Sequence, residues 1–266
     1  MKDADVGAGP FGMQLRRWRS ARGLTQLALA QRASTTTRHV SFLETGRSRP
    51  RAQLVQRLAQ ALGLQPREHN ALLEAAGLPA RFPQRPLDDD QLMRYSSAID
   101  SLLRRHEPLP AAVVNRYGAV LRANAAFERV TPGLVGLTPE ELVDRNFGPG
   151  PWRDAIENWP EVATSWLTRQ RHEADRTRDP RLHALVEQAA ELIGPLPPGT
   201  VTDDGPMTCA RVRIGDDVFE LFALVARFDS AHDVTLSELR VELMYPGNEA
   251  AARWLGVDGE RLSDAG

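Results

Sequence analysis

The sequence predicts two domains of different class: an all-α domain of five short helices, followed by an α+β domain with an antiparallel sheet. Two periodicities support this prediction. Up to about residue 76, apolar residues recur every three or four positions, as in helices. From Ala111 onward, segments with the alternation of strands appear between helical segments. Three prolines within 78–86 separate the regions. We therefore predict a flexible N-terminus at 1–10, domains at 11–78 and 88–266, and a linker at 79–87.

The first predicted helix spans Phe11 to Arg22. Four of its apolar residues fall at spacings of four, three and three positions and form one stripe: Phe11, Leu15, Trp18 and Ala21. Arginines surround this stripe. The pattern predicts an amphipathic helix with one face in a core and the other in solvent.

Two short helices follow and meet at a tight turn. Thr25 is suited to cap the first of them, because its hydroxyl can accept a hydrogen bond from a backbone N–H of the first turn. Leu27 and Ala30 are apolar or small, so we expect both to face a core. The turn itself is predicted at residues 33–35.

The second helix of the pair is predicted from Thr37 to Glu44, with Gly46 just beyond its end. Val40 and Leu43 are three positions apart and therefore share one buried face. Four other side chains can then face outward, those of the capping residue Thr36 and of Thr37, Arg38 and Phe42.

This outward face suits the major groove of DNA. Helices that read the groove place their N-terminal residues against base edges. Arg38 can make two hydrogen bonds to guanine, and a threonine methyl can touch the methyl of thymine. Arg47, Arg49 and Arg51 follow in the loop and can hold phosphates, which positions a protein without reading sequence.

The charge distribution agrees with this interpretation. Residues 11–80 contain eleven arginines and three glutamates, a net charge of +8, whereas residues 81–266 carry a net charge of −9. The whole chain has a net charge of only −2. A basic first quarter attached to an acidic remainder is typical of a DNA-binding module joined to a domain with another task.

Two more helices complete the all-α domain. The first runs from Ala52 to Leu62 before Gly63, and the second starts at Pro66 and ends before Gly77. With them, the first domain resembles the helix-turn-helix of the xenobiotic-response-element (lambda-repressor-like) regulators. The matching residues are Leu24-Thr25-Gln26, Leu27-Ala28, Val40-Ser41, Leu43-Glu44-Thr45-Gly46-Arg47 and Arg49-Pro50.

That resemblance implies a set of DNA contacts. It places Arg47 on a phosphate, and near the DNA it places Gln26, Thr36, Thr37, Arg38 and Phe42. One position departs from the family pattern, since Ser34 stands at the turn where glycine is usual. Either the backbone there is left-handed, which costs more for serine than for glycine, or the turn is reshaped.

The second domain is predicted to begin with a helix after Asp88-Asp89-Asp90, because acidic residues favour a helix N-terminus. The sequence leaves open whether this helix is a dimerisation arm or packs on its own domain. Two strands at 111–115 and 119–122 follow, around a glycine turn, and Asn124 then opens a short helix. This order resembles the opening of a PAS-type sensor domain.

Helices that carry tryptophans fill the middle of this domain. A helical region from Pro151 to Ala174 is interrupted at Pro160, which predicts two helices, and another begins after Asp179-Pro180. A loop is predicted at 195–198. The remaining elements are strands at 208–214, 218–226 and 239–245, a helical turn at 235–238, and a last helix at 248–255.

The resemblance then extends over most of the chain. Segments 38–50, 68–89, 113–130, 158–192 and 233–246 together resemble the MmyB-like regulators, which join a repressor-type DNA reader to a PAS-like ligand-binding domain. This implies a bacterial transcription regulator whose effector is a fatty-acid-like or other small apolar ligand. The segment 211–228 departs from the family because it lacks a strand rich in serine and threonine.

A sheet with one apolar face, covered by these helices, can enclose a small apolar pocket. Arg116 or Arg122 could hold a carboxylate headgroup there. The expected lining residues are Phe127, Trp152, Ile156, Trp159, Trp166, Phe222, Leu224, Leu243 and Tyr245. Each of these could equally be an ordinary core residue.

An enzyme is disfavoured, since the six histidines form no metal-binding spacing and no nucleophile or phosphate-loop motif occurs. We expect no cofactor or metal, apart from a bound fatty acid or similar effector. Cys209 is the only cysteine, which excludes an intramolecular disulfide, and we expect it in a core. The chain also lacks an apolar run of membrane-spanning length or a signal peptide, so we expect a cytoplasmic protein.

These observations predict a homodimeric, sequence-specific transcription regulator, a repressor, that binds double-stranded operator DNA and is controlled by a small apolar ligand. The first alternative is a constitutive regulator whose second domain serves only dimerisation or protein interaction. A DNA-binding antitoxin or a pure interaction module is a second alternative, disfavoured by the length of the second domain.

Overall fold

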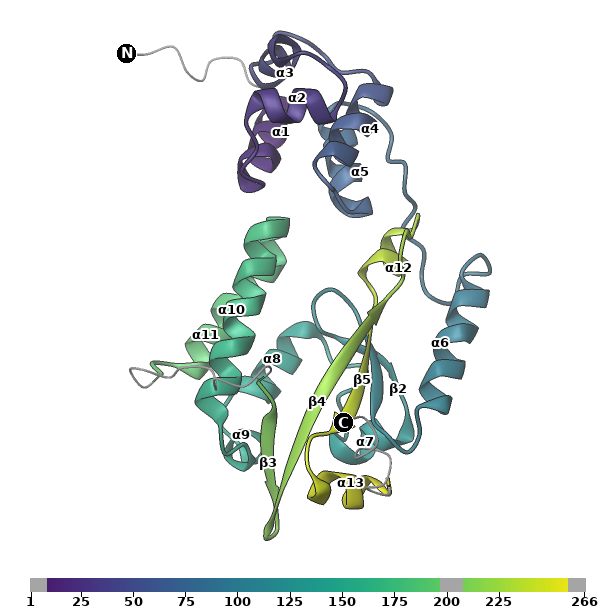
Figure 1. The fold of residues 1–266 in the computed structure, drawn as a ribbon, viewed down its shortest axis with the longest axis vertical. Helices are drawn as coiled ribbons and strands as arrows, with labels where there is room; N and C mark the ends of the chain where they lie inside the picture. Colours follow the sequence, from purple (N-terminus) through teal and green to yellow (C-terminus); the bar gives the residue numbers. More distant parts are fainter. Residues whose placement is uncertain (1–8, 197–207, 258–266) are drawn as a thin grey trace, which may run out of the picture. The chain divides into compact units, whose positions relative to one another are not determined.

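The computed structural model describes residues 9–196 and 208–257 (Figure 1). The predicted flexible N-terminus therefore lies outside the described residues up to residue 8, as do residues 197 and 198 of the predicted loop at 195–198. The chain divides into two compact units. The helical unit combines Met1–Pro86 with Asp229–Ser237, and the sheet unit combines Leu87–Phe228 with Glu238–Gly266.

The helical unit contains the five predicted helices: α1 (Pro10–Ala21), α2 (Gln26–Arg32), α3 (Thr37–Glu44), α4 (Ala52–Ala61) and α5 (Pro66–Ala75). Their ends follow the capping signals. The Thr25 hydroxyl accepts a hydrogen bond from the Ala28 N–H at 3.1 Å, and Gln65 and Glu68 form a capping box at α5. The predicted all-α class of the first domain is thus confirmed.

The core of the helical unit is built from the predicted apolar stripes, including Leu15, Leu29, Val40 and Leu58. Leu27 is an exception, since 56% of it is exposed and the expectation that it faces the core is wrong. The buried side of the short helix α2 consists instead of Leu29 and Ala30, and Leu27 points away from it.

Glycine lets α1 approach α3 closely. A Cβ atom at Gly12 would lie 2.6 Å from the carbonyl oxygen of Leu43 and 2.7 Å from that of Glu44. Backbone atoms cannot easily yield at such distances, so a side chain at this position would push the two helices apart. Gly12 therefore allows the C-terminal end of α3 to pack closely against α1.

The segment that follows α5 is held by hydrogen bonds, although several of its residues are exposed. The Asn70 side chain accepts from the Arg81 and Phe82 N–H groups at 3.0 Å and donates to the Phe82 carbonyl at 2.7 Å. On the other side, Asp233 accepts from Arg85 at 3.0 Å. The Val234 N–H also donates to the Pro83 carbonyl at 2.8 Å.

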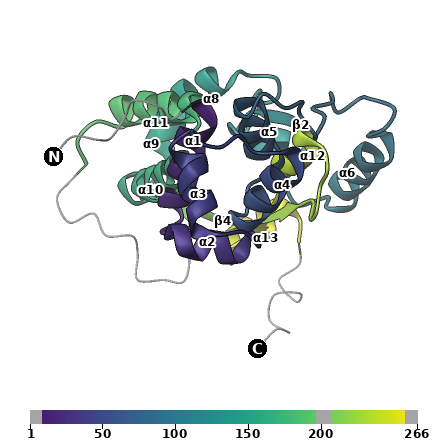
Figure 2. The same ribbon diagram turned by 90° about the horizontal axis from the view of Figure 1, so that it is seen from above.

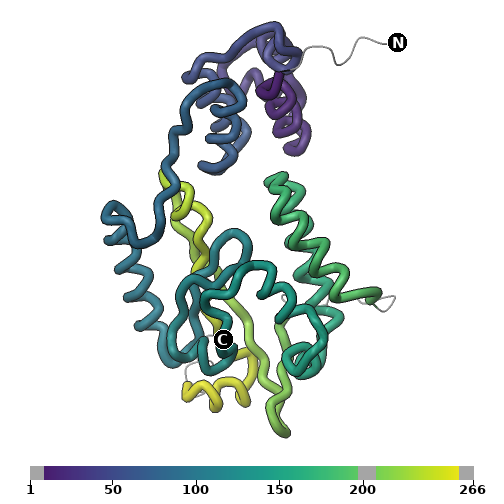
Figure 3. The backbone as a smooth tube through the Cα atoms, turned by 180° about the vertical axis from the view of Figure 1, so that it is seen from behind, coloured from purple at the N-terminus to yellow at the C-terminus, as the bar shows by residue number. Residues whose placement is uncertain are grey.

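These last partners come from a distant part of the sequence. Residues 229–237 belong to the connection between two strands of the sheet and include all but the last residue of α12 (Val234–Glu238), as the tube in Figure 3 shows. The predicted helical turn is present, but it starts one residue earlier than expected. Asp233 caps it, and its side chain accepts from the Thr235 N–H at 2.9 Å.

The sheet unit is built on five antiparallel strands in the order β2-β1-β5-β4-β3. Every predicted strand is present, with small shifts at the ends. The bounds are β1 (Ala111–Val114), β2 (Val120–Ala123), β3 (Ala210–Ile214), β4 (Asp217–Arg227) and β5 (Arg240–Pro246). The α+β class with an antiparallel sheet is therefore confirmed.

Seven more helices belong to the sheet unit: α6 (Met93–Arg105), α7 (Ala125–Val130), α8 (Pro139–Phe147), α9 (Pro151–Ala155), α10 (Trp159–Thr177), α11 (Pro180–Ile193) and α13 (Glu249–Leu255). Helices α10 and α11 pack side by side in both Figures 1 and 2. Among the described residues, no helix has the length and apolar character needed to cross a membrane.

Cross-strand partners show which residues share a face of the sheet, because directly paired residues point to the same side. Phe222 pairs with Tyr245, and Leu224 pairs with Leu243. Ring contacts place α6 along this face, since Tyr95 packs edge-on against Phe228 and His106 packs edge-on against Tyr245. We call it the α6 face. Helix α6 thus packs on its own unit, one of the two arrangements left open by the sequence.

The opposite face of the sheet is also partly covered by other elements, whereas a sheet with one buried face was expected. Met244 packs against the cluster that contains Phe127, Leu134 and Leu142. Arg240 and Glu242 belong to the same face, and both are only partly exposed. Arg240 interacts electrostatically with Arg169 and Glu173 of α10, so we call this the α10 face.

Asn124 joins three elements of the sheet unit. Its buried side-chain oxygen accepts from the Ala111 N–H at 3.0 Å and from the Phe127 N–H at 2.9 Å. Its amide nitrogen donates to the carbonyls of Leu103 at 3.2 Å and Leu109 at 2.8 Å. The residue predicted as a helix cap therefore also ties α6 and β1 to α7.

Candidate nucleic-acid interface

The N-terminal end of α3 carries the exposed residues expected to contact DNA. Thr36 caps the helix, because its hydroxyl accepts from the His39 N–H at 3.1 Å. Thr36, Thr37 and Arg38 are all exposed. The opposite side of the helix buries Val40 and Leu43, as the spacing predicted. Helix α3 therefore presents its first turn outward while its rear face is fixed in the core.

Arg38 and Phe42 are arranged as one element on the helix surface. The guanidinium carbon of Arg38 lies 5.1 Å from the centre of the Phe42 ring, one helical turn away. This cation–π contact orients the guanidinium along the helix instead of leaving it to rotate in solvent. An oriented guanidinium is suited to two parallel hydrogen bonds with one acceptor edge.

The C-terminal end of α3 is anchored by a buried carboxylate. Arg19 of α1 donates from Nε to Glu44 Oε1 at 2.6 Å and from Nη2 to Oε2 at 3.0 Å. Its third nitrogen, Nη1, donates to the Leu24 carbonyl at 2.7 Å. The hydrogen bond to Glu44 raises the pKa of Arg19. Arg19 therefore stays charged, and its hydrogen bonds connect α1, α3 and the segment at Leu24.

Gln26 also takes part in this anchor. Its amide nitrogen donates to Glu44 Oε2 at 2.8 Å, and its side chain is partly buried. One of its N–H groups is thus engaged within the protein, although the resemblance implied a position near DNA. Sequence reasoning missed the role of Glu44. The only signal in the sequence was its position next to the buried Leu43.

The remaining candidates lie in the loop between α3 and α4. Arg47, Arg49 and Arg51 are exposed there, and Gly46 has a φ of +73° that suits the turn. The loop is tied back to α3, because the Ser48 N–H donates to the Phe42 carbonyl at 3.2 Å. These cations are therefore carried on a short loop beside the exposed end of the helix.

The turn between α2 and α3 contains the serine noted above. Ser34 has a φ of +50°, in the left-handed region that serine rarely adopts, and its side chain is exposed. Of the two possibilities that the sequence left open, a left-handed serine or a reshaped turn, the structure has the left-handed serine. Left-handed backbone costs an L-residue about 1–2 kcal/mol relative to its preferred conformations.

Ser34→Gly is expected to stabilise the helical unit by about 0.5–1 kcal/mol, because glycine relieves this strain but loses more entropy on folding. Urea unfolding of the full chain, followed by hydrogen exchange of peptides from residues 10–75, measures the change. Ser20→Gly, within α1, serves as the control and should destabilise the unit by about 0.5 kcal/mol. A destabilised Ser34→Gly variant would show that the serine side chain is needed in the turn.

In the sheet unit, the structure separates the nine expected ligand-lining residues into three groups. Phe127 packs with Leu134 and Leu142 on the α10 face. Trp152, Ile156, Trp159 and Trp166 belong to a cluster among α8–α11 and β3. The last four lie on the α6 face, namely Phe222, Leu224, Leu243 and Tyr245.

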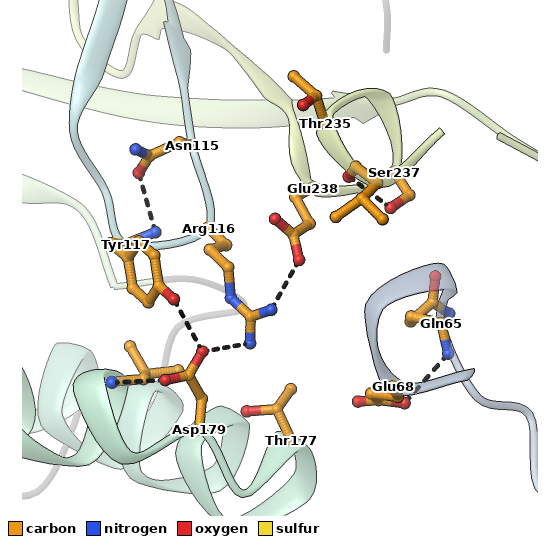
Figure 4. Close-up of polar contacts among 12 residues, drawn as sticks. Gln65, Glu68, Asn115, Arg116, Tyr117, Thr177, Asp179, Thr235, Ser237 and Glu238 are labelled. Atoms are coloured by element: carbon orange, nitrogen blue, oxygen red, sulfur yellow. Dashed lines mark hydrogen bonds and ion pairs between the residues drawn. The ribbon is translucent and has the colours of Figure 1, made fainter. Parts of the chain in front are cut away.

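The two arginines considered for a carboxylate headgroup already have acidic partners. Arg116 lies 2.8 Å from Asp179 and 2.6 Å from Glu238, and the Tyr117 hydroxyl donates to Asp179 at 3.0 Å (Figure 4). Arg122 lies 2.8 Å from Asp100. Carboxylates of the chain itself thus occupy both guanidinium groups.

Within the described ranges, no group of three histidine, cysteine, aspartate or glutamate side chains could hold a metal ion. Cys209 is partly buried just before β3, and its carbonyl accepts from the Asn158 side chain at 2.8 Å.

Comparison with protein families assigns both regions. Residues 10–72 match the model of a helix-turn-helix domain, and residues 95–256 match that of the MmyB-like transcription regulator ligand binding domain. A search of curated proteins finds no match.

Two solved structures are similar to part of the chain. The restriction-modification controller protein C.AhdI from Aeromonas hydrophila is 35% identical over 23% of this chain and 91% of its own, with a TM-score of 0.22. The clp gene regulator ClgR from C. glutamicum is 30% identical over 27% of this chain and 92% of its own, with a TM-score of 0.24.

Proposed function

This chain belongs to the family of MmyB-like transcription regulators, and we propose that it is a homodimeric repressor whose operator binding is controlled by a small apolar, fatty-acid-like ligand in its sheet unit. The two family matches identify the chain as a helix-turn-helix DNA-binding regulator with a ligand-binding domain. The proposal adds the direction of control and the class of effector.

The observation that carries the DNA-binding part is the exposed first turn of α3. The major groove admits an α-helix, and the N-terminal residues of such a helix reach base edges. Thr37 and Arg38 are the exposed residues of that turn, and Arg38 is held over Phe42. In the proposal, Gln26, Thr36 and Phe42 support this contact, while Arg47 and Arg49 hold phosphates.

In a homodimer, the two α3 helices would enter successive major grooves, about 34 Å apart. A ligand changes operator binding only if it binds the DNA-competent and DNA-incompetent conformations with different affinity. The proposed mechanism is therefore a ligand-dependent shift between two arrangements of the paired DNA readers.

Arg38→Ala is expected to weaken binding to a selected operator by about 1–3 kcal/mol and to relax preference at one base position. Binding to single-base variants of the operator measures both effects. Arg38→Lys separates their causes, because lysine keeps the charge but cannot make the paired hydrogen bonds. Wild-type affinity and wild-type base preference in Arg38→Ala would contradict the assignment.

Arg47→Ala is expected to weaken all sequences alike, because a phosphate contact carries no base information. The slope of log affinity against log salt should become shallower by about one unit. Arg253→Ala in α13, which removes an exposed arginine of the sheet unit, is the matched control and should leave the slope unchanged. An altered base preference in Arg47→Ala would contradict a pure phosphate contact.

The ligand part of the proposal is tested separately. Native mass spectrometry of the purified protein should reveal a retained small molecule, and tryptophan fluorescence should respond to fatty acids or aldehydes. If neither signal appears, the constitutive alternative gains support, in which the sheet unit serves only dimerisation or protein interaction.

A further inference from the structure

The imidazole of His39, on α3, contacts both of the segments that flank this helix. Its Nδ1 lies 3.1 Å from the hydroxyl oxygen of Thr35, in the turn before α3. Its Nε2 lies 3.5 Å from the hydroxyl oxygen of Ser48, in the loop after α3. One side chain of α3 therefore connects the turn that precedes the helix with the loop that follows it.

The Thr35 end of this bridge is fixed by the backbone. The Thr35 N–H donates to the Ala30 carbonyl at 2.9 Å, which ties the residue to the buried side of α2. Thr35 and His39 are both partly buried. A hydrogen bond at one nitrogen of an imidazole restricts the ring and selects its tautomer. Thr35 thus directs the second nitrogen of His39 toward the loop.

Ser48 is the least exposed residue in its part of the loop. It is partly buried, whereas Arg47 and Arg49 on either side of it are exposed. Its N–H donates to the Phe42 carbonyl at 3.2 Å. The backbone of Ser48 is therefore held by Phe42 and its side chain by His39, and an arginine extends from the loop on each side of this point.

Hydroxyl groups suit both contacts, because each can donate or accept a hydrogen bond, and a neutral imidazole has one nitrogen of each kind. The Ser48 contact is long for a hydrogen bond, so we expect it to add little to the stability of the free protein. It can still limit the directions in which Arg47 and Arg49 extend. Ordering long side chains in advance reduces the entropy that is lost on binding.

We propose that His39 positions the phosphate-binding loop: by holding Ser48 against α3, it orients Arg47 and Arg49 toward the DNA backbone. His39 is a positioning residue in this inference, because it acts through the two arginines and does not itself read a base. The inference rests on the DNA-binding function proposed above. It adds that a residue within α3 contributes to the sequence-independent part of the affinity.

Ser48→Val and Ser48→Thr test the bridge in the full chain, because the two new side chains have nearly the same shape and only threonine keeps a hydroxyl. Ser48→Val should weaken binding to the operator and to unrelated duplex alike, by about three- to tenfold. The slope of log affinity against log salt should become shallower by up to about one unit. Ser48→Thr should keep most of the wild-type affinity. Ser20→Val, at an exposed position of α1, is the matched control.

A double-mutant cycle tests whether His39 and Ser48 act as one unit. His39→Leu should weaken both duplexes by a factor similar to that of Ser48→Val. The second change should then add less than about a twofold loss, because both changes remove the same bridge. In a protein that carries Arg47→Ala and Arg49→Ala, either change should alter affinity by less than about twofold. Urea unfolding verifies that every variant is folded.

The outcomes separate this inference from the proposed function. A Ser48→Val protein with wild-type affinity and salt slope would overturn the inference, even when Arg47→Ala flattens the slope as expected. A His39→Leu protein with altered preference among single-base variants of the operator would overturn it as well, because His39 would then read a base. An unchanged slope in the protein with both Arg47→Ala and Arg49→Ala would reject the proposed phosphate contacts, and this inference with them.

Discussion

Glu44→Ala is expected to lower the unfolding free energy of the helical unit by about 3–5 kcal/mol. The side chain of Glu44 is only 3% exposed and is bonded to both Arg19 and Gln26. Removing the carboxylate leaves the Arg19 guanidinium, which is itself 14% exposed, without its charged partner. Operator binding should fall as well, because α3 loses the anchor at its C-terminal end.

Hydrogen exchange of α3 peptides as a function of urea measures this loss in the full chain. Glu74→Ala, at an exposed position of α5, is the matched control and should change stability by less than about 0.5 kcal/mol. Glu44→Gln keeps a hydrogen-bonding oxygen but loses the charge. Its loss of stability should therefore lie between those of Glu44→Ala and Glu74→Ala. A Glu44→Ala protein with wild-type protection in α3 would show that the anchor contributes nothing.

Asn124→Ala is expected to cost the sheet unit about 3–5 kcal/mol, since it leaves two buried N–H groups and two carbonyls without their partner. The loss should be cooperative across α6, β1 and α7, because one amide connects all three. Tryptophan fluorescence during urea unfolding reports on this unit, which contains four of the five tryptophans.

Asn115→Ala provides a graded comparison. Its side chain accepts from the Tyr117 and Ala119 N–H groups at 2.9 and 3.0 Å, two bonds instead of four. Its cost should be about half as large or less. Asn124→Asp keeps the two accepted bonds but cannot donate, so it should fall between alanine and wild type. Equal losses at residues 115 and 124 would contradict the connecting role of Asn124.

The helical unit could be predicted almost to the residue, because local signals define its helices. Thr36 and Glu44 bound the region in which α3 was expected, and the structure confirms Thr37–Glu44. A left-handed backbone at Ser34 was one of the two possibilities that the family pattern left open. By contrast, the contact of Glu44 with Arg19 is made between residues 25 apart in sequence, and no local pattern reveals such a pairing.

The sheet unit was predictable in its elements but not in its faces. The segment of β4 from Val218 to Ala226 is apolar at nearly every position, so alternation could not show which side chains point which way. The cross-strand register decides this, and it separates Phe222 and Leu224 from Phe127. Helix α8 was missed although Thr138 and Glu141 form a capping box at its start.

Residues 229–237 are hydrogen-bonded to Pro83 and Arg85, which matters when the domains of such regulators are exchanged. The helix-turn-helix match is contiguous at residues 10–72, but the helical unit also includes Asp229–Ser237. A graft of the first 86 residues onto a foreign sensor would therefore leave Asp233 and Val234 behind. A chimera that keeps these contacts must carry both pieces of chain. Because the second piece lies between two strands, the receiving domain must contain a sheet of similar topology.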